Sequence, residues 1–217
     1  DKKLGKNNLV TEYDYKSERY IIDSIRESFP THNIISEEKG SILNESEYYW
    51  VIDPLDGTVN FANNIPIFSV SIALLKGNKI ITGSVYQPIL DELFTAEIDK
   101  GAFLNDKPIS VSKKSDLDTS LLVTGFPYSY EQESEQNKII NSFANIVKRG
   151  IPVRRLGSAA LDLSYVACGR FEGFWESNLN SWDVSAGILI VNEAGGKCTN
   201  YKNQSSNIDD NQIIATN

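Results

Sequence analysis

Two aspartates, Asp53 and Asp56, come directly after a hydrophobic run and are followed by Gly57 and Thr58. Pro54 between them fixes φ and removes a backbone donor, so the turn that carries the two carboxylates is expected to be stiff. Both carboxylates can then point into one cavity, close enough to share a hard cation. Gly57 and Thr58 begin the next segment, and free amides at the start of a helix bind phosphate. The stretch therefore combines metal ligands with an anion site.

The same stretch has a simpler interpretation, because Asp-Pro-x-Asp-Gly consists of good turn formers. Further acidic residues favour chemistry over a plain turn. Glu37 and Glu38 follow a short apolar run, and Asp183 stands where an apolar helix is expected to begin. Each also has a structural alternative, with Glu37 and Glu38 as a solvated charge pair and Asp183 as a helix N-cap.

The composition excludes several catalytic mechanisms. The sequence has one histidine, His32, which excludes a zinc site with two histidine ligands and leaves His32 alone as a base for a serine or cysteine nucleophile. Its two cysteines, Cys168 and Cys198, lie far apart and form no CxxC motif. Catalysis would therefore depend on carboxylates, hydroxyls, backbone amides and a hard metal ion.

Net charge and hydropathy limit the classes of partner and the cellular compartment to be expected for this protein. The 217 residues include 21 Lys and Arg against 29 Asp and Glu, a net charge of −8 that disfavours nucleic acids and anionic membranes as partners. The longest apolar stretch, residues 65–75, is shorter than the roughly 18 residues of a membrane span. No signal peptide is evident, and two thiols that need not pair indicate a reducing compartment. We expect a cytoplasmic protein.

The elements that must position these residues differ between two halves of the chain. A helix is predicted over residues 16–29, where isoleucines recur on one face, with Asp14 as its N-cap. Residues 48–52 read as a buried strand, and residues 67–112 alternate between strands and turns. The first half, residues 1–115, is thus predicted to be α+β, an antiparallel sheet flanked by a helix.

The second half, residues 116–217, begins after a polar stretch at residues 113–119. Strands and helices alternate there, which predicts an α/β arrangement. The predicted strands are residues 121–124, 152–156 and 171–176, and the predicted helices are residues 131–148, 158–168 and 183–193. The two halves are expected to complete one active site.

Five stretches of the sequence together carry a family pattern: WVIDPLDGTVNF at 50–61, WDVSAGILIVNEAGG at 182–196, GSAALDL at 157–163, GRFEGFWE at 169–176 and NLVTEYD at 8–14. They occur in the order and spacing of the inositol monophosphatase family, and the chain resembles its bacterial branch over essentially its whole length. The resemblance implies the layered αβαβα sandwich of the inositol monophosphatase and fructose-1,6-bisphosphatase superfamily. Its members are lithium-sensitive, magnesium-dependent phosphomonoesterases.

The resemblance implies magnesium as the cofactor, with two ions per site and a weaker third near Glu37. It assigns Glu37, Asp53 and the carbonyl of Leu55 to the first ion. It assigns Asp53, Asp56 and Asp183 to the second, with Asp53 bridging. Oxygen ligands favour magnesium over zinc, and two cations about 4 Å apart can clamp the attacking and leaving oxygens of an in-line displacement.

The resemblance also implies a nucleophilic water that the metal activates, with Glu37 and Thr58 positioning and deprotonating it. Asp14 would support Thr58 through a hydrogen bond, although a plain helix cap is the alternative. For Ser158 and Glu176 the alternatives are an N-cap and a surface residue at a strand end. The residues expected to contact substrate are Leu55, Asp56, Gly57, Thr58, Gly157, Ser158, Ala159, Glu176 and Asp183.

Two departures and one unassigned pair accompany the resemblance. Helices expected at both ends of family members are not evident in the sequence, and Asn8 occupies a position where many relatives carry aspartate. Arg154 and Arg155 belong either to a dimer surface or to substrate binding. Substrates with several phosphates would need such cations, for which Lys3 is a further candidate.

These observations predict a phosphatase that hydrolyses myo-inositol 1-phosphate or a similar small polyol phosphate, acting as a homodimer. Fructose-1,6-bisphosphatase or another sugar or nucleotide phosphatase of the superfamily is the alternative. A regulatory protein that binds transcription machinery is an alternative of another class. A calcium-binding structural domain is a third, with little else in the sequence to support it.

Overall fold

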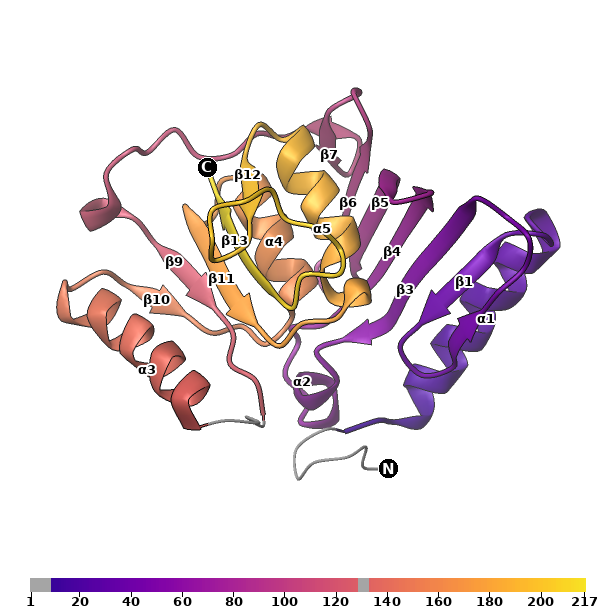
Figure 1. Cartoon of the computed structure of the whole chain (residues 1–217), viewed down its shortest axis with the longest axis horizontal. Coiled ribbons are helices and arrows are strands. Elements are labelled where there is room, and N and C mark those ends of the chain that lie inside the picture. The colour runs from indigo at the N-terminus through magenta and orange to yellow at the C-terminus, as the bar shows by residue number, and fades with distance from the viewer. Residues whose placement is uncertain (1–8, 129–132) are drawn as a thin grey trace.

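The computed structural model of the chain describes residues 9–128 and 133–217. They form two β-sheets with helices between and outside them (Figure 1). Lys3, Asn8 and the first two residues of the helix predicted at 131–148 lie outside the described residues.

The first sheet contains eight strands in the order β2-β1-β3-β4-β5-β6-β7-β8. Its neighbouring strands are antiparallel except β1 and β3, which run parallel with Ile35 opposite Val51. The strands are β1 (Asn33–Ser36), β2 (Gly40–Ile42), β3 (Tyr48–Asp56), β4 (Ser69–Lys76), β5 (Lys79–Gln87), β6 (Glu92–Glu97), β7 (Ala102–Leu104) and β8 (Lys107–Pro108).

The second sheet contains five strands in the order β10-β9-β11-β13-β12. β9 runs parallel to both β10 and β11, whereas β13 is antiparallel to both β11 and β12. The strands are β9 (Leu122–Thr124), β10 (Val153–Arg154), β11 (Gly173–Ser177), β12 (Lys197–Thr199) and β13 (Gln212–Thr216).

The helices separate and cover the sheets. α4 and α5 contact strands of both sheets, α1 packs against β3, and α3 lies on the far side of the second sheet (Figure 1). The order is therefore helix, sheet, helices, sheet, helix, which confirms the layered sandwich that the family resemblance implied. The helices are α1 (Glu12–Ser28), α2 (Thr58–Ala62), α3 (Glu133–Lys148), α4 (Ala159–Ala167) and α5 (Ser181–Glu193), with a 3-10 turn at Leu117–Thr119.

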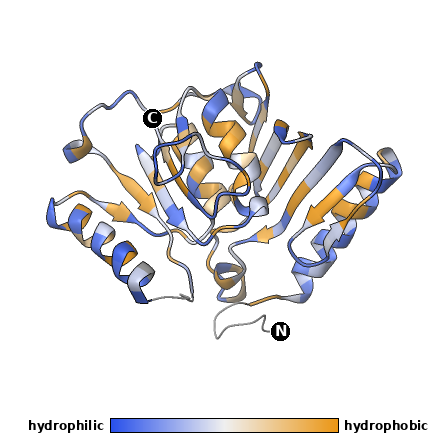
Figure 2. Ribbon diagram, in the orientation of Figure 1, coloured by the Kyte–Doolittle hydropathy of each residue, from blue (hydrophilic) through white to orange (hydrophobic). Residues whose placement is uncertain are grey.

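Burial on both faces explains the composition of the central elements. Every residue of α4 is buried, and the central helices are largely hydrophobic in Figure 2, whereas α1 and α3 carry hydrophilic faces. In β3 successive side chains point to opposite faces. Val51 therefore joins the core around α4 and α5, while Ile52 packs with Ile22 and Ile25 of α1. A strand buried on both faces reads as a continuous apolar run.

The prediction that Asp14 caps a helix beginning at residue 16 is wrong. The helix begins at Glu12, with Thr11 as N-cap, and Asp14 is the third helical residue, whose carboxylate accepts from the Thr11 amide at 2.8 Å. Hydrophobic periodicity missed this first turn because Tyr13 and Tyr15 are exposed. α5 repeats the arrangement, since Asn180 is its N-cap and Asp183 is its third residue. The capping-box pattern accounts for both.

The division predicted at residues 115 and 116 falls between the last strand of the first sheet and the first strand of the second. We propose that the two halves form one compact unit, because α4 and α5 of the second half pack against strands of the first. No helix among the described residues is long and apolar enough to cross a membrane.

Candidate active site

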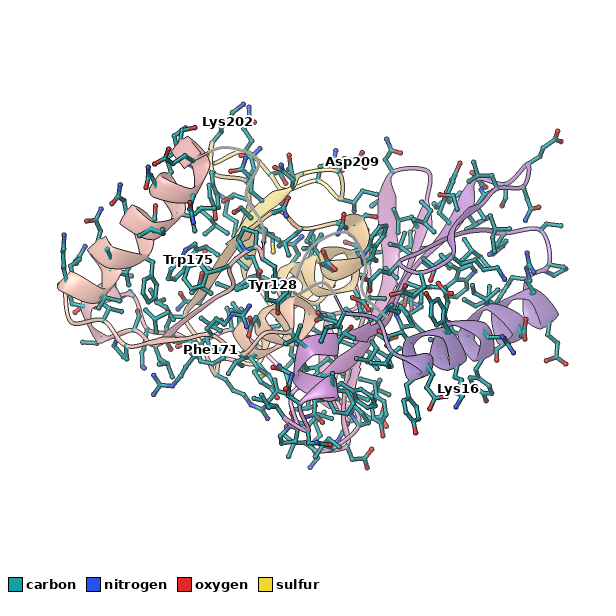
Figure 3. All side chains as sticks on the ribbon, turned by 90° about the horizontal axis from the view of Figure 1, so that it is seen from below. Lys16, Tyr128, Phe171, Trp175, Lys202 and Asp209 are labelled. Carbon is teal, nitrogen blue, oxygen red and sulfur yellow. The ribbon has the colours of Figure 1, made fainter. Side chains whose placement is uncertain are left out.

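A cavity of about 230 Å³ lies where strands from both sheets end and three helices begin. The carboxyl ends of β1, β3, β9 and β11 meet the amino ends of α2, α4 and α5 there. Figure 3 views this end of the molecule, with Tyr128 near the middle. The cavity is lined by Leu9, Glu37, Asp53, Leu55, Asp56, Gly57, Thr58, Val59, Phe126, Pro127, Tyr128, Arg155, Gly157, Ala159, Glu176, Asn178, Leu179, Asn180 and Asp183.

Most of the residues predicted from the sequence line this cavity. Those that do so are Glu37, Asp53, Leu55, Asp56, Gly57, Thr58, Gly157, Ala159, Glu176 and Asp183. Asp14 and Ser158 do not line it; both are buried and bond to residues that do. The bond between Asp14 and Thr58 is the one predicted for Asp14, whereas Ser158, which was expected to contact substrate, bonds to Asp56.

Asp53 lies at an irregularity of β3. Its pairing with β4 shifts between Asp53 and Asp56, and its Oδ1 accepts the Leu55 amide at 3.0 Å, so the backbone turns towards the cavity. The side chain is only 2% exposed. Burial raises the pKa of the Asp53 carboxyl well above its usual range, and the nearby charges of Glu37, Asp56 and Asp183 raise it further.

Asp56 is held at the start of α4. Its Oδ2 accepts from the Ser158 hydroxyl at 2.6 Å and from the Ala160 amide at 2.8 Å. These bonds lower its pKa, but loss of solvation outweighs them and raises the pKa of Asp56 to about 6. A residue of the first sheet is thus fixed by a helix of the second half.

Thr58 is oriented by two acceptors. Its Oγ1 lies 3.0 Å from Asp14 Oδ1 and 3.0 Å from the Leu55 carbonyl oxygen. Asp14 is fully buried, and its other oxygen is held by Thr11. Because the single hydroxyl proton of Thr58 is engaged with these acceptors, its lone pairs are left to accept a hydrogen bond from the cavity.

Two glycines let the loops of the two halves approach closely. Gly57 and Gly157 have φ of +95° and +85°, and a Cβ on Gly57 would lie 3.2 Å from the Gly157 carbonyl oxygen. Asn60 Nδ2 ties the same loops together by donating to the carbonyl oxygens of Ile67 and Leu156, each at 2.7 Å. Side chains at the glycines would be strained and would separate the loops.

Glu176 and Asp183 complete the acidic lining of the cavity. Asp183 Oδ2 accepts the Asn180 amide at 2.6 Å, and burial together with the Asp56 charge raises the pKa of Asp183 to about 8. Glu176 accepts no hydrogen bond within the described parts of the chain. Burial, with the charge of Asp183, raises the pKa of Glu176 to about 8. A Cβ on Gly125 would lie 2.0 Å from its Oε2, so only glycine leaves it room.

The carboxylates of the cavity repel one another, and one lysine or arginine, Arg155, stands against five carboxylates in the described part of the wall. In residues 9–128 and 133–217 no three His, Cys, Asp or Glu side chains already form a metal-ion site. The side chains nevertheless supply oxygen donors alone, which suit a hard divalent cation. Burial and the charges of neighbouring carboxylates raise the pKa of these groups. A bound cation would lower the pKa again, because it stabilises the charged form of each carboxylate.

Several lining residues were not predicted from the sequence. Most belong to the loops after β9 and β11, one lies in α2 and one precedes α1. They are Phe126, Pro127, Tyr128, Asn178, Leu179, Asn180, Val59 and Leu9. The usable signal is their position directly after predicted strands, where binding residues gather in α/β folds. Gly125, which makes room for Glu176, directly follows the strand predicted at 121–124 and so carries the same signal.

A larger depression of about 530 Å³ over β11 and β13 contains none of the predicted residues. Glu172 in it accepts the Leu121 amide at 2.7 Å and pairs with Lys114 at 3.5 Å. Its acidic group is therefore already compensated by Lys114 and by the Leu121 amide.

The chain matches the model of the inositol monophosphatase family over residues 1–217. It is 44% identical to an inositol-1-monophosphatase from Synechocystis sp., over 97% of this chain and 73% of that protein. It is 44% identical to a Nus factor SuhB from Haemophilus influenzae, over 97% of this chain and 79% of that protein. In structure it is similar to an inositol monophosphatase from Anabaena (Nostoc), with a TM-score of 0.88 and 45% identity over 94% of this chain and 81% of that one.

Proposed function

The chain belongs to the inositol monophosphatase family and is a phosphatase, and we propose that it is a magnesium-dependent phosphomonoesterase of myo-inositol 1-phosphate or a similar small polyol phosphate. One observation carries the proposal. Carboxylates from β1, β3, β11 and α5 face the amino end of α2 across one cavity. Such a cavity can hold cations and a phosphate together.

The family is metal-dependent, and the oxygen donors of this cavity fit magnesium. Glu37, Asp53, Asp56, Asp183 and the carbonyl oxygen of Leu55 would hold it. When bound, magnesium supplies positive charge that activates water and stabilises the phosphoryl oxygens in the transition state.

The backbone at the start of α2 is suited to the phosphate. In the part of the chain that the structure describes, the amides of Gly57 and Thr58 donate to no acceptor. They are fixed by the left-handed conformation of Gly57 and by the helix that follows. Donors fixed in advance need no reorganisation as charge develops on the phosphoryl oxygens, which is how such sites lower the barrier.

Thr58 and Glu37 would act on the attacking water. The Thr58 hydroxyl, its proton engaged with Asp14 and Leu55, accepts a hydrogen bond from that water and orients it. Glu37 takes the second proton as the water oxygen bonds to phosphorus. The bond from phosphorus to the alcohol oxygen breaks, and the alkoxide takes a proton from solvent.

The alcohol would occupy the end of the cavity between Gly157, Ala159 and Glu176. The Glu176 carboxylate, which lacks a hydrogen-bond donor among the described residues, can accept from hydroxyl groups of a polyol. Ser158 contributes indirectly, by holding Asp56 through its hydroxyl.

Phosphate release from inositol 1-phosphate, with and without magnesium, tests the proposal on the wild type and Asp56→Asn. Histidinol phosphate, adenosine 3′,5′-bisphosphate and NADP would complete the substrate panel. We expect magnesium-dependent turnover that Asp56→Asn abolishes, because the amide retains the shape but not the charge of the ligand. Absence of turnover from the folded wild type on every substrate would contradict the proposal.

A regulatory role is the second candidate, because a relative 44% identical is named a Nus factor. The two roles are separated by measuring both hydrolysis and the binding of transcription proteins, on the wild type and on Asp56→Asn. Loss of hydrolysis with retained binding would show that both exist, whereas binding without any wild-type hydrolysis would leave regulation alone.

We further propose a homodimer that works in the cytoplasm and is inhibited by lithium, as the family resemblance implied. Cys168 and Cys198 are both free, which agrees with a reducing compartment. Sedimentation and lithium titration of phosphate release test the first and last of these points.

A further inference from the structure

Arg155 is the basic residue of an otherwise acidic cavity. In the cavity wall formed by the described residues it is the one lysine or arginine. Its guanidinium carbon lies 5.5 Å from the ring centroid of Tyr128, another lining residue. A Cβ on Gly157 would lie 3.2 Å from its Nη1, so the side chain passes close to the wall that faces the alcohol.

The guanidinium has no hydrogen bond or ion pair with any described residue. The charge of Arg155 nevertheless acts on two carboxylates. Burial raises the pKa of Glu176 and of the fully buried Asp162, and Arg155 lowers it by a smaller amount. Neither oxygen of Asp162 has a hydrogen-bond partner among the described residues. The two carboxylates favour a cation at this end of the cavity while leaving its donors free.

The neighbouring arginine behaves differently. Arg154 does not line the cavity, and its Nη1 donates to the carbonyl oxygen of Val153 at 3.3 Å. The two residues have the same chemistry and adjacent positions, so only one of them is placed to meet a ligand.

We propose that Arg155 is a specificity-determining residue that binds a second phosphate carried by the leaving alcohol, as in a sugar bisphosphate. The inference rests on the phosphatase function proposed above. A planar guanidinium presents donors in a fork that matches phosphate oxygens, and such charge-assisted pairs are strong. The Tyr128 ring limits the directions that the fork can take.

Charge explains why a second phosphate needs this residue. The lining carboxylates are Glu37, Asp53, Asp56, Glu176 and Asp183. The proposed magnesium ions would compensate the group around Asp53, but Glu176 lies at the alcohol end. A dianion approaching Glu176 would be repelled without Arg155 beside it.

Fructose 1-phosphate and fructose 1,6-bisphosphate are matched probes, because they differ in one phosphate. We expect Arg155→Gln to lower kcat/KM for the bisphosphate by about 10- to 100-fold more than for the monophosphate, mainly through KM. Arg155→Lys should retain part of the preference. Arg154→Gln is the matched control and should leave the ratio of the two substrates unchanged.

If neither sugar is a substrate, calorimetry of the two sugars with the magnesium-loaded protein gives the ratio of their affinities directly. If neither sugar nor any substrate of the panel above is hydrolysed but the binding ratio falls in Arg155→Gln, the proposed function fails and the role of Arg155 stands. If Arg155→Gln weakens both sugars equally, or if the wild type has no preference for the bisphosphate, the inference about Arg155 is overturned.

Discussion

The two ends of the cavity differ in how their polar groups are held. At the phosphate end, Asp53, Asp56 and Thr58 bond to backbone amides, to a backbone carbonyl or to buried side chains. At the alcohol end, Glu176 and Arg155 have no hydrogen-bond partner among the described residues. The comparison indicates that groups acting on phosphorus are fixed by the fold, whereas groups facing the alcohol are left to be satisfied by the ligand.

The energetic consequence follows from the cost of unpaired polar groups. Glu176 is half-buried and Arg155 is exposed, so solvent satisfies both groups in the free protein. A ligand that covers either group without bonding to it costs about 1–3 kcal/mol, and a substrate that supplies the partner avoids that cost. Specificity therefore resides at the end where the protein leaves its own groups unsatisfied.

The largest effect should come from Asp53→Asn at the phosphate end. The amide oxygen can still accept from Leu55, so the turn is retained, but the charge is lost. We expect kcat to fall on the order of 1,000-fold, the upper range for removing one electrostatic contribution at a reaction centre. Phosphate release measured against magnesium concentration checks it. If high magnesium restored full activity to Asp53→Asn, Asp53 would contribute only to magnesium affinity.

Thr58→Val should lower kcat by about 100-fold, because a general-base step loses the hydroxyl that orients the water. Thr58→Ser is the control, since its hydroxyl can bond to Asp14 and Leu55 in the same way. Steady-state kinetics of both variants measure the difference. Equal losses in the two variants would show that packing of the methyl group, rather than the hydroxyl, matters.

Gly125→Ala tests the alcohol end. The new Cβ would overlap the Glu176 carboxylate and displace it. We expect about a 10-fold loss of kcat/KM for inositol 1-phosphate, as for a lost hydrogen bond to a charged group. The kcat/KM for 4-nitrophenyl phosphate, which has no polyol, should fall less. Equal losses of kcat/KM for the two substrates would contradict the distinction between the two ends.

The smallest expected effect concerns stability. Burial raises the pKa of Asp56 to about 6 and of Asp183 to about 8, so the metal-free folded state binds more protons than the unfolded state. Its stability should therefore fall as pH rises from about 4 to about 8. Magnesium at 100 times its Kd should raise the free energy of unfolding by about 2.7 kcal/mol, which corresponds to roughly 5–10 °C in Tm.

Differential scanning calorimetry with magnesium and with EDTA, at pH 6 and pH 8, measures this effect. The gain from magnesium should be larger at pH 8, because fewer protons must then be displaced from the carboxylates. An equal gain at both pH values would show that the titrating groups do not bind the ion.

Much of the fold was predictable, because hydrophobic periodicity is strong where burial is one-sided. Along β4, buried residues such as Ala73 and Leu75 alternate with partly exposed ones, and a turn joins β4 to β5. The short strands β1 and β2 were not predicted, since three or four residues show no period. The first turn of α1 was missed because the aromatic residues there face solvent.

The phosphate end was predictable for a local reason: Asp53, Asp56 and Thr58 are close in sequence and follow a buried strand. The alcohol end was predictable only in part, because Gly157, Ala159 and Glu176 came from the family resemblance and from no local pattern. Tyr128 and Asn178 come from loops that meet only after β9 and β11 have paired, and no local sequence pattern predicts that contact. For Arg155 both a dimer surface and substrate binding stayed open, because sequence alone does not distinguish it from Arg154.

The bond between Asn60 and Leu156 joins residues 96 positions apart, and that between Asp56 and Ser158 spans 102. During synthesis the first half therefore leaves the ribosome with Asp53 and Asp56 already made, but without the loop that orients them. A nascent chain of that length carries the acidic groups in an unassembled state. Hydrolytic activity is thus delayed until the segment that carries Leu156 and Ser158 has been translated and has folded.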